Sequence, residues 1–193
     1  MPRISALEFE RLPLRVHAFL AGVPLHDVWA VDLPRIRPGI TLDEFLRKGG
    51  PRPYRLSPVV RALLSIRLCI GSLLGWDRKP TKTWESFAKR LTTTDHSKSV
   101  VPASTREGLF RVVYRFENEQ LLEVINRTAH AAAFSTLVEM ANTYRFYFAV
   151  YVCNVSSFTP IYMALIDPFR KLIVYPSLLR SVRASWNEAF GTG

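Results

Sequence analysis

The sequence predicts an α+β fold in which an antiparallel sheet is followed by one long C-terminal helix. Large apolar side chains occupy every second position of residues 110–116, which is the period of a half-buried strand. From residue 159 to residue 190, apolar side chains instead recur near every 3.6 residues, as they do in an amphipathic helix. A chain of 193 residues can bury a core without disulfide or metal support. We therefore expect a single domain.

Four elements are predicted before the sheet proper. Ser5 opens a capping box for a short first helix, and residues 26–33 form a strand that a proline closes. Thr41 is a good N-cap for a helix over residues 42–48, whose acidic first turn suits the positive end of the helix dipole. Residues 57–74 form a long, mostly buried helix, because a Ser-Pro pair opens it and it contains only two charges.

A polar, basic connection then leads into four strands of an antiparallel meander. Residues 84–91 form a short helical stretch within this connection. Short polar turns separate the strands, which cover residues 110–116, 121–126, 130–139 and 143–154. The last strand is apolar on both faces, so both faces must be covered. We expect the C-terminal helix on one face, and either the helix near residue 65 or a second subunit, as in a homodimer, on the other.

The C-terminal segment predicts a helix with two interruptions. Residues 167–168 form an Asp-Pro pair that restarts the helix, and Pro176 kinks it, because its ring removes a backbone hydrogen bond. The apolar positions expected to face the sheet are Ile161, Leu165, Phe169, Ile173, Val182, Trp186 and Phe190. Residues 146–166 carry no charge and are long enough to cross a bilayer. Polar residues at the centre of that run favour a strand, a turn and a buried helix instead.

Composition excludes several classes of protein. With 48% hydrophobic residues and two cysteines, the chain is neither disordered, nor collagen-like, nor a disulfide-rich miniprotein. The net charge is +10, and residues 47–106 hold 13 basic residues against 3 acidic ones. Such a region makes an anionic membrane surface a candidate partner. We do not expect nucleic acid, because no zinc-finger spacing, RNP-like motif or basic recognition helix is present.

No targeting signal is recognised in the first 25 residues, so we expect a cytoplasmic protein. The apolar stretch at residues 16–25 is interrupted by His17, Gly22 and Pro24, and acidic rather than basic residues precede it. Cys69 and Cys153 lie in apolar runs, which indicates reduced, buried thiols.

Three motifs give the chain a resemblance to a known superfamily. They are His26-Asp27-Val28-Trp29 with Leu33-Pro34, Leu74-Gly75-Trp76-Asp77, and Ile161-Tyr162-Met163-Ala164-Leu165-Ile166-Asp167-Pro168-Phe169. Over residues 14–183 the chain resembles an uncharacterised bacterial family of the START-like (helix-grip, SRPBCC) superfamily. Domains of that family also occur fused C-terminal to sugar-epimerase-like dehydrogenase domains. The resemblance implies one START-like domain over residues 1–193, with residues 1–25 as an N-terminal extension.

The resemblance implies a curved antiparallel sheet wrapped around the C-terminal helix, with an apolar cavity between them. Two positions depart from the family pattern. Arg170 stands where the family commonly has a histidine after Pro-Phe, so any role of that imidazole is missing. Where the family usually has an acidic residue close to a histidine, this chain has Asn126, Arg127 and His130. Only His130 therefore matches the family pattern.

No motif in the sequence identifies a reaction. It contains no nucleophile elbow, no phosphate-binding glycine loop and no histidine pair with metal-ligand spacing, so we expect neither a metal nor another cofactor. Cys153 is a poor nucleophile, because its neighbours are apolar. The paired carboxylates at residues 43–44 do not indicate acid/base chemistry, because the positive end of the helix that starts there favours acidic residues.

The function that we expect is non-covalent binding of an apolar or amphipathic small molecule between the sheet and the C-terminal helix. Tyr114 and Tyr162 are the best polar groups for orienting it, since a buried hydroxyl needs a partner. The full set of expected ligand-binding residues is Phe110, Val112, Tyr114, His130, Phe146, Phe148, Val150 and Tyr162. One alternative is an enzyme of the polyketide-cyclase type, in which Tyr114, His130 or Tyr162 moves a proton. Another is a protein with a filled core that acts through its surface.

Overall fold

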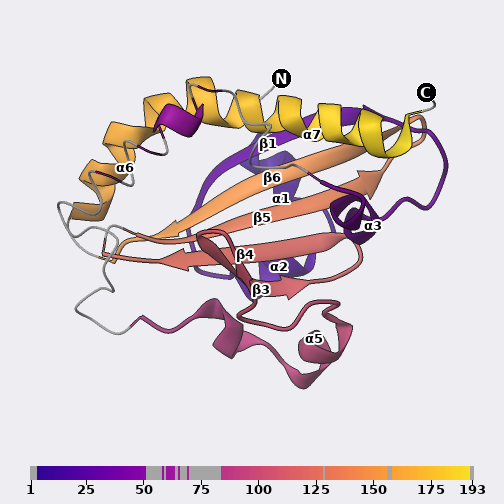
Figure 1. Cartoon of the computed structure of the whole chain (residues 1–193). Helices are drawn as coiled ribbons and strands as arrows, with labels where there is room; N and C mark the ends of the chain where they lie inside the picture. Colours follow the sequence, from indigo (N-terminus) through magenta and orange to yellow (C-terminus); the bar gives the residue numbers. More distant parts are fainter. Residues whose placement is uncertain are drawn as a thin grey trace.

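Figure 1 shows a computed structural model of the chain, which describes residues 4–50, 58, 60–63, 65, 69, 84–127, 129–155 and 158–191. Its strands form one antiparallel sheet in the order β1-β6-β5-β4-β3-β2. They are β1 (Leu25–Pro34), β2 (Arg106–Glu107), β3 (Phe110–Arg115), β4 (Glu119–Ile125), β5 (His130–Glu139) and β6 (Thr143–Cys153). The predicted strand near residue 30 and the four-stranded meander are confirmed, and the short β2 is an addition.

The helices are α1 (Ala6–Glu10), α2 (Arg15–Phe19), α3 (Leu42–Arg47), the 3-10 helix η2 (Phe87–Arg90), α5 (Thr93–Lys98), α6 (Phe158–Phe169), the π-helical turn η3 (Arg170–Val174) and α7 (Tyr175–Phe190). Both residues are N-caps as predicted, since Ser5 accepts from the amide of Glu8 and Thr41 from that of Glu44. The full capping box is formed instead at Thr92 and Asp95. Most of the helix predicted over residues 57–74 lies outside the described residues. Those described within it, 58, 60–63, 65 and 69, are helical, but Val60 alone among them is buried, so the predicted burial of this helix is wrong for the described residues.

One face of the sheet packs against the C-terminal helix, which crosses it from end to end (Figure 1). The core here is densest along α7, where Leu179, Val182 and Trp186 are fully buried. Trp186 packs against Tyr144 and Phe45, with ring centroids 5.3 Å apart in both pairs. Its indole Nε1 donates to the carbonyl oxygen of Pro34 at 3.0 Å. The predicted burial of Val182 and Trp186 is therefore confirmed.

The opposite face of the sheet is covered by the N-terminal segment. Phe9 of α1 and Val16 of α2 are fully buried there, against Tyr147 and Ala149 of β6. From the sequence, we expected either the helix near residue 65 or a second subunit to cover this face. The residues expected as an N-terminal extension thus supply part of the core. The sequence analysis did not predict α2.

The part of the C-terminal helix before α7 differs from the prediction. Ile161, Leu165 and Phe169 are exposed, whereas Tyr162 and Met163 face the sheet. Residues 167–168 do not restart the helix but lie within α6. The irregularity lies at η3, just before Pro176, where the amide of Tyr175 bonds to the carbonyl of Arg170, five residues back. This wider turn changes which side chains face the sheet, so one 3.6-residue period does not describe the whole segment.

Two further expectations concern the thiols and the apolar run at residues 146–166. Within the described parts of the chain, no helix combines the length and the apolar character needed to cross a bilayer. The run divides into a strand and a helix, as predicted. Both cysteines are free, but Cys69 is exposed rather than buried, and Cys153 is half-buried.

The packing along the C-terminal helix predicts a contrast between two leucines. Leu179→Ala removes a fully buried side chain and should lower the free energy of unfolding by about 2–5 kcal/mol. Leu172→Ala, the same substitution at an exposed position, should change it by less than about 0.5 kcal/mol. Urea unfolding followed by circular dichroism measures both values. Equal effects would show that α7 is not packed on the sheet as described.

Candidate functional site

A cavity of about 340 Å³ lies between the segment around η2 and one end of the sheet. Phe87 and His130 are its buried residues, whereas Lys89 and Arg90 are exposed and lie at its rim. The complete lining is Trp84, Glu85, Ser86, Phe87, Lys89, Arg90, His130 and Cys153. Aromatic surface, hydrogen-bonding groups and cations thus meet in one small space.

Glu123 holds the two sides of this cavity together. Its buried carboxylate accepts hydrogen bonds from the Ser86 hydroxyl and, at 2.9 Å, from the backbone amide of Phe87. The Nε2 atom of His130 lies 3.1 Å from the same carboxylate. Burial alone would raise the pKa of Glu123, but the hydrogen bonds from His130, Ser86 and Phe87 outweigh it and lower the pKa. The carboxylate is therefore ionised at neutral pH.

This network fixes the position of His130 and makes its Nε2 atom a hydrogen-bond donor. An ionised carboxylate can only accept hydrogen bonds, so Nε2 of His130 carries a proton that it donates to Glu123. The imidazole also stacks on the Phe87 ring, with centroids 4.0 Å apart. A histidine held by a carboxylate in this way is a common arrangement in proton-transfer sites.

Cys153 lies beside His130, opposite it in the β5–β6 pairing. Burial raises the pKa of the Cys153 thiol, and the nearby charge of Arg90 only partly opposes this. The thiolate is the reactive form of cysteine, so a raised pKa disfavours a nucleophilic role. Cys153 is a lining residue of the cavity.

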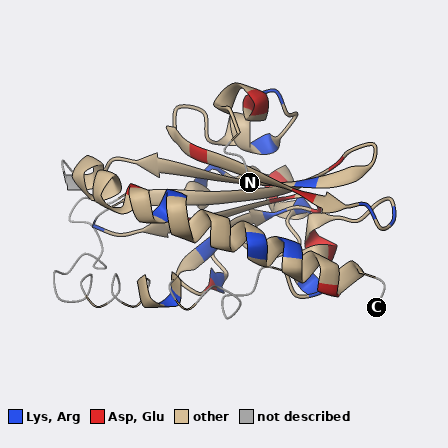
Figure 2. Cartoon of the chain, turned by 90° about the horizontal axis from the view of Figure 1, so that it is seen from above, with Lys and Arg blue, Asp and Glu red and all other residues tan. Residues whose placement is uncertain are grey.

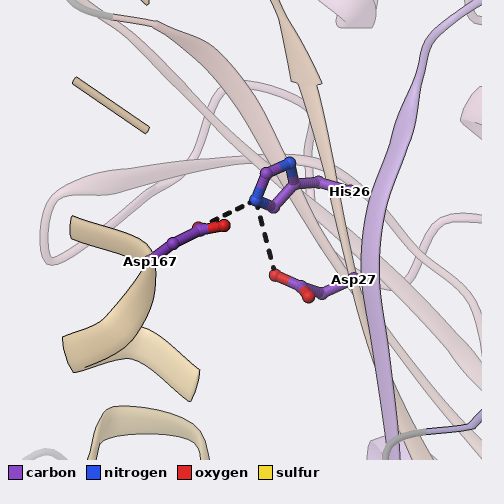
Figure 3. A group of neighbouring side chains, drawn as sticks. All are labelled: His26, Asp27 and Asp167. Atoms are coloured by element: carbon purple, nitrogen blue, oxygen red, sulfur yellow. Dashed lines mark hydrogen bonds and ion pairs between the residues drawn. The ribbon is translucent and has the colours of Figure 1, made fainter. Parts of the chain in front are cut away.

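A second polar cluster lies on the other face of the same end of the sheet. Figure 3 shows His26 and Asp27 of β1 beside Asp167 of α6. The Nε2 atom of His26 lies 2.9 Å from Oδ1 of Asp167 and 3.7 Å from Oδ2 of Asp27. One ligand atom from each residue lies within 4.8 Å of the other two, so the three side chains have the spacing of a metal site.

Two cations of the chain already neutralise these carboxylates. Arg170 donates to Asp167 at 3.0 Å and to Asp27 at 3.4 Å, and it also donates to the hydroxyl of Tyr175. Lys171 donates to the second oxygen of Asp167 at 2.7 Å. We therefore describe this cluster as an ion-pair network that ties the C-terminal helix to β1. Arg170, at the position where the resemblance expects a histidine, is its centre.

The structure divides the predicted ligand-binding residues between the two faces of the sheet. Phe146, Phe148, Val150 and Tyr162 lie on the face of the C-terminal helix, as expected. His130 and Tyr114 lie on the opposite face. Phe110 and Val112 of β3 belong to neither core cluster, although Val112 is fully buried.

A β-bulge explains the position of Tyr114. The β3–β4 register shifts between Val112 and Tyr114, so Val113 and Tyr114 both join the core on the N-terminal helix side. There Tyr114 packs edge-on against Phe19, and its hydroxyl donates to Glu119 at 3.3 Å. Strict alternation, on which the prediction relied, does not allow for an extra residue in the strand.

The sequence did not predict a role for Glu123, Ser86, Trp84 or Phe87. One signal for Glu123 was present, since it shares a face of β4 with the buried Leu121. A buried carboxylate needs partners, and the β4–β5 turn brings His130 opposite Ile125, diagonally next to Glu123. Ser86 and Phe87 reach the cavity through tertiary packing, for which the sequence held no periodic signal.

The fold and these contacts define an α+β protein with an antiparallel sheet between two helical layers and a polar cavity at one end. A family model described as "Protein of unknown function (DUF2867)" matches residues 19–177, and the chain belongs to this family. The match extends from α2 to the start of α7 and includes both polar clusters. No curated protein and no solved structure matches the chain.

The Glu123 network predicts a specific loss of stability. Glu123→Gln puts an amide where three donors converge, so it should lower the free energy of unfolding by about 1–3 kcal/mol. The matched change Glu85→Gln removes an exposed carboxylate at the cavity rim and should cost less than about 0.5 kcal/mol. Denaturant unfolding at neutral pH measures both. Similar values for the two variants would contradict the network.

The Asp167 ion pairs predict a pH dependence of stability. Burial raises the pKa of Asp167, but hydrogen bonds from Lys171 and His26 outweigh this and leave the pKa below its ordinary value. Because the folded pKa is the lower one, Asp167 stabilises the fold above its unfolded pKa, and this stabilisation is lost as the pH falls through the folded pKa.

The unfolding free energies of the unaltered protein and of Asp167→Asn should therefore differ most near neutral pH and converge as the pH falls below the ordinary pKa range of an aspartate. Urea unfolding across this range measures the difference. A difference that stays constant with pH would show that the carboxylate of Asp167 is not stabilised by these ion pairs.

Proposed function

We propose that the protein binds a small amphipathic molecule in the cavity beside His130. The observation that carries the proposal is the composition of this cavity, in which two aromatic side chains, a fixed imidazole, the guanidinium of Arg90 and the Lys89–Glu85 ion pair surround about 340 Å³. Small-molecule sites are concave and combine apolar surface with a few well-placed polar groups, and their volumes start near about 300 Å³. The ligand is therefore small.

The chemistry of the lining indicates what kind of ligand fits. Trp84 and Phe87 offer apolar surface to a flat or aliphatic body. Lys89 is paired with Glu85 of the lining at 3.0 Å, so Arg90 is the rim residue that favours an anionic group such as a carboxylate. Its guanidinium is held 5.1 Å above the Phe87 ring. A small aromatic or aliphatic acid combines both features.

We also propose that the chain adopts the START-like helix-grip fold. The long helix packed across an antiparallel sheet supports this proposal. The resemblance implies a ligand between the sheet and the C-terminal helix. Phe148 of the sheet is only partly buried there, and Tyr162 of the helix faces the sheet. This interface is the alternative location for the ligand, but along α7 it is packed with Leu179, Val182 and Trp186.

A proton-transfer enzyme is the second candidate, and the His130–Glu123 pair favours it. A carboxylate that accepts from Nε2 orients the imidazole, so His130 would serve as the general base or acid for a bound substrate. A polyketide-cyclase-like reaction belongs to this class. His130→Gln tests this candidate at saturating ligand, where weaker binding no longer limits the rate, and it should abolish any conversion of the ligand there.

The proposal predicts saturable binding of an amphipathic acid. A panel of aromatic carboxylates, fatty acids, sterols and aromatic polyketides is titrated by isothermal calorimetry, and at least one acid should bind with a Kd in the micromolar range, about −8 kcal/mol. Arg90→Gln should weaken that binding about tenfold, because it removes a charged hydrogen-bond donor at the rim. Arg111→Gln, at an exposed position outside the lining, is the matched control and should leave the Kd unchanged.

A third variant tests the location of the ligand. Phe148→Arg places a charge at the interface between sheet and C-terminal helix and should not affect binding beside His130. If Phe148→Arg abolishes binding while Arg90→Gln does not, the ligand lies under the helix and the proposed location is wrong. If no member of the panel binds saturably, the binding function is wrong and a protein that acts through its surface takes its place.

A further inference from the structure

The outer face of α6 and η3 is an exposed apolar stripe, made of Ile161, Leu165, Phe169 and Leu172. Their exposed fractions are 64%, 62%, 48% and 77%. The spacings of four, four and three residues place all four side chains on one side of the helix. Tyr162 and Met163, on the other side, are the residues that α6 buries against the sheet. The stripe is therefore turned away from the core.

Basic residues continue the same helix beyond the stripe. Arg180 and Arg183 of α7 are exposed, whereas the residues just before them, Leu179 and Val182, are buried against the sheet, so both arginines lie on the outer side of α7. Their guanidinium groups donate to backbone carbonyls, those of Pro176 and Asp32. Figure 2, which looks down on this helix, shows basic positions along it. The outer face is thus apolar at one end and cationic at the other.

We propose that this face binds the surface of an anionic lipid bilayer. The four apolar side chains would enter the boundary between headgroups and acyl chains, and the two arginines would contact headgroup phosphates. Amphipathic helices bind membranes in this way, lying in the plane of the interface. Each basic residue close to such a surface adds to the attraction, and the net charge of +10 acts in the same direction.

Charge favours a lipid surface over a second copy of the chain. In a two-fold dimer through the stripe, two strongly basic molecules would meet face to face. Asp167 is the one acidic residue of the sequence between Ile161 and Arg183, and it is already bonded to Arg170 and Lys171. The stripe therefore offers no carboxylate to pair with the arginines of a partner copy. Anionic lipid headgroups do offer that charge.

The test is flotation of the full-length protein with vesicles at low salt. The protein should float with vesicles of equal parts phosphatidylcholine and phosphatidylglycerol, and much less with phosphatidylcholine alone. Leu165→Ser with Leu172→Ser should reduce the partition coefficient on the mixed vesicles about tenfold or more. Leu7→Ser with Leu109→Ser changes two leucines of similar exposure elsewhere and should leave it unchanged. All these positions are exposed, and circular dichroism checks that each variant is folded.

The arginines are tested separately. Arg180→Gln with Arg183→Gln should lower binding to the mixed vesicles about tenfold and weaken its dependence on salt. Arg11→Gln with Arg111→Gln removes the same charge from other exposed positions and should have a smaller effect.

Three results would overturn the proposal. The first is no flotation with the mixed vesicles at low salt, and the second is an equal loss in the stripe variant and its control. The third is a dimer, seen by light scattering without lipid, that the stripe variant dissociates while vesicle binding is absent or unchanged. In that case a second copy of the chain covers the stripe.

Discussion

The fold depends on the need to bury both faces of β6. Phe146 and Val150 point to one side of this strand and Tyr147 and Ala149 to the other, and all four are buried. β6 also pairs along its length with β1 and β5, so its backbone is satisfied within the sheet. A sheet that contains such an interior strand requires cover on both sides. The C-terminal helix and the N-terminal helices α1 and α2 are the two covers.

The same geometry separates a packed end of the sheet from a polar end. Near the start of β6, Tyr144 packs against Trp186 in a buried aromatic core. At its other end, His130 lies opposite Cys153 and Asp27 lies opposite Val150. Both polar clusters are therefore at this second end, on opposite faces. Buried aromatic packing is concentrated at one end of the sheet. The other end holds buried charges, whose burial is costly without partners.

The sequence predicted the strands well because their side-chain pattern is regular. The meander over residues 110–154 was found from the period of two and from polar turns, and local residues set both features. Tyr114 was assigned to the wrong face because a bulge adds one residue to β3, and a period of two does not contain that information. The cavity depends on contacts between residues far apart in the chain, such as Ser86 with Glu123. Only His130 among its lining residues was predicted.

In the C-terminal helix, the predicted 3.6-residue period is correct, but some of the side chains assigned to the sheet-facing side are exposed. Its apolar residues do recur as in a helix, but Ile161, Leu165 and Phe169 were expected to face the sheet and are exposed. The wide turn η3 changes the register between α6 and α7, so Val182 and Trp186 are buried while the earlier residues of the series are not.

This difference bears on why the stripe is apolar at all. A side chain that stays exposed in the folded state loses little contact with water on folding, so it contributes little to stability. Polar residues at positions 161, 165, 169 and 172 would therefore serve the fold equally well. A large apolar stripe on a chain of net charge +10 is instead explained by contact with something outside the fold.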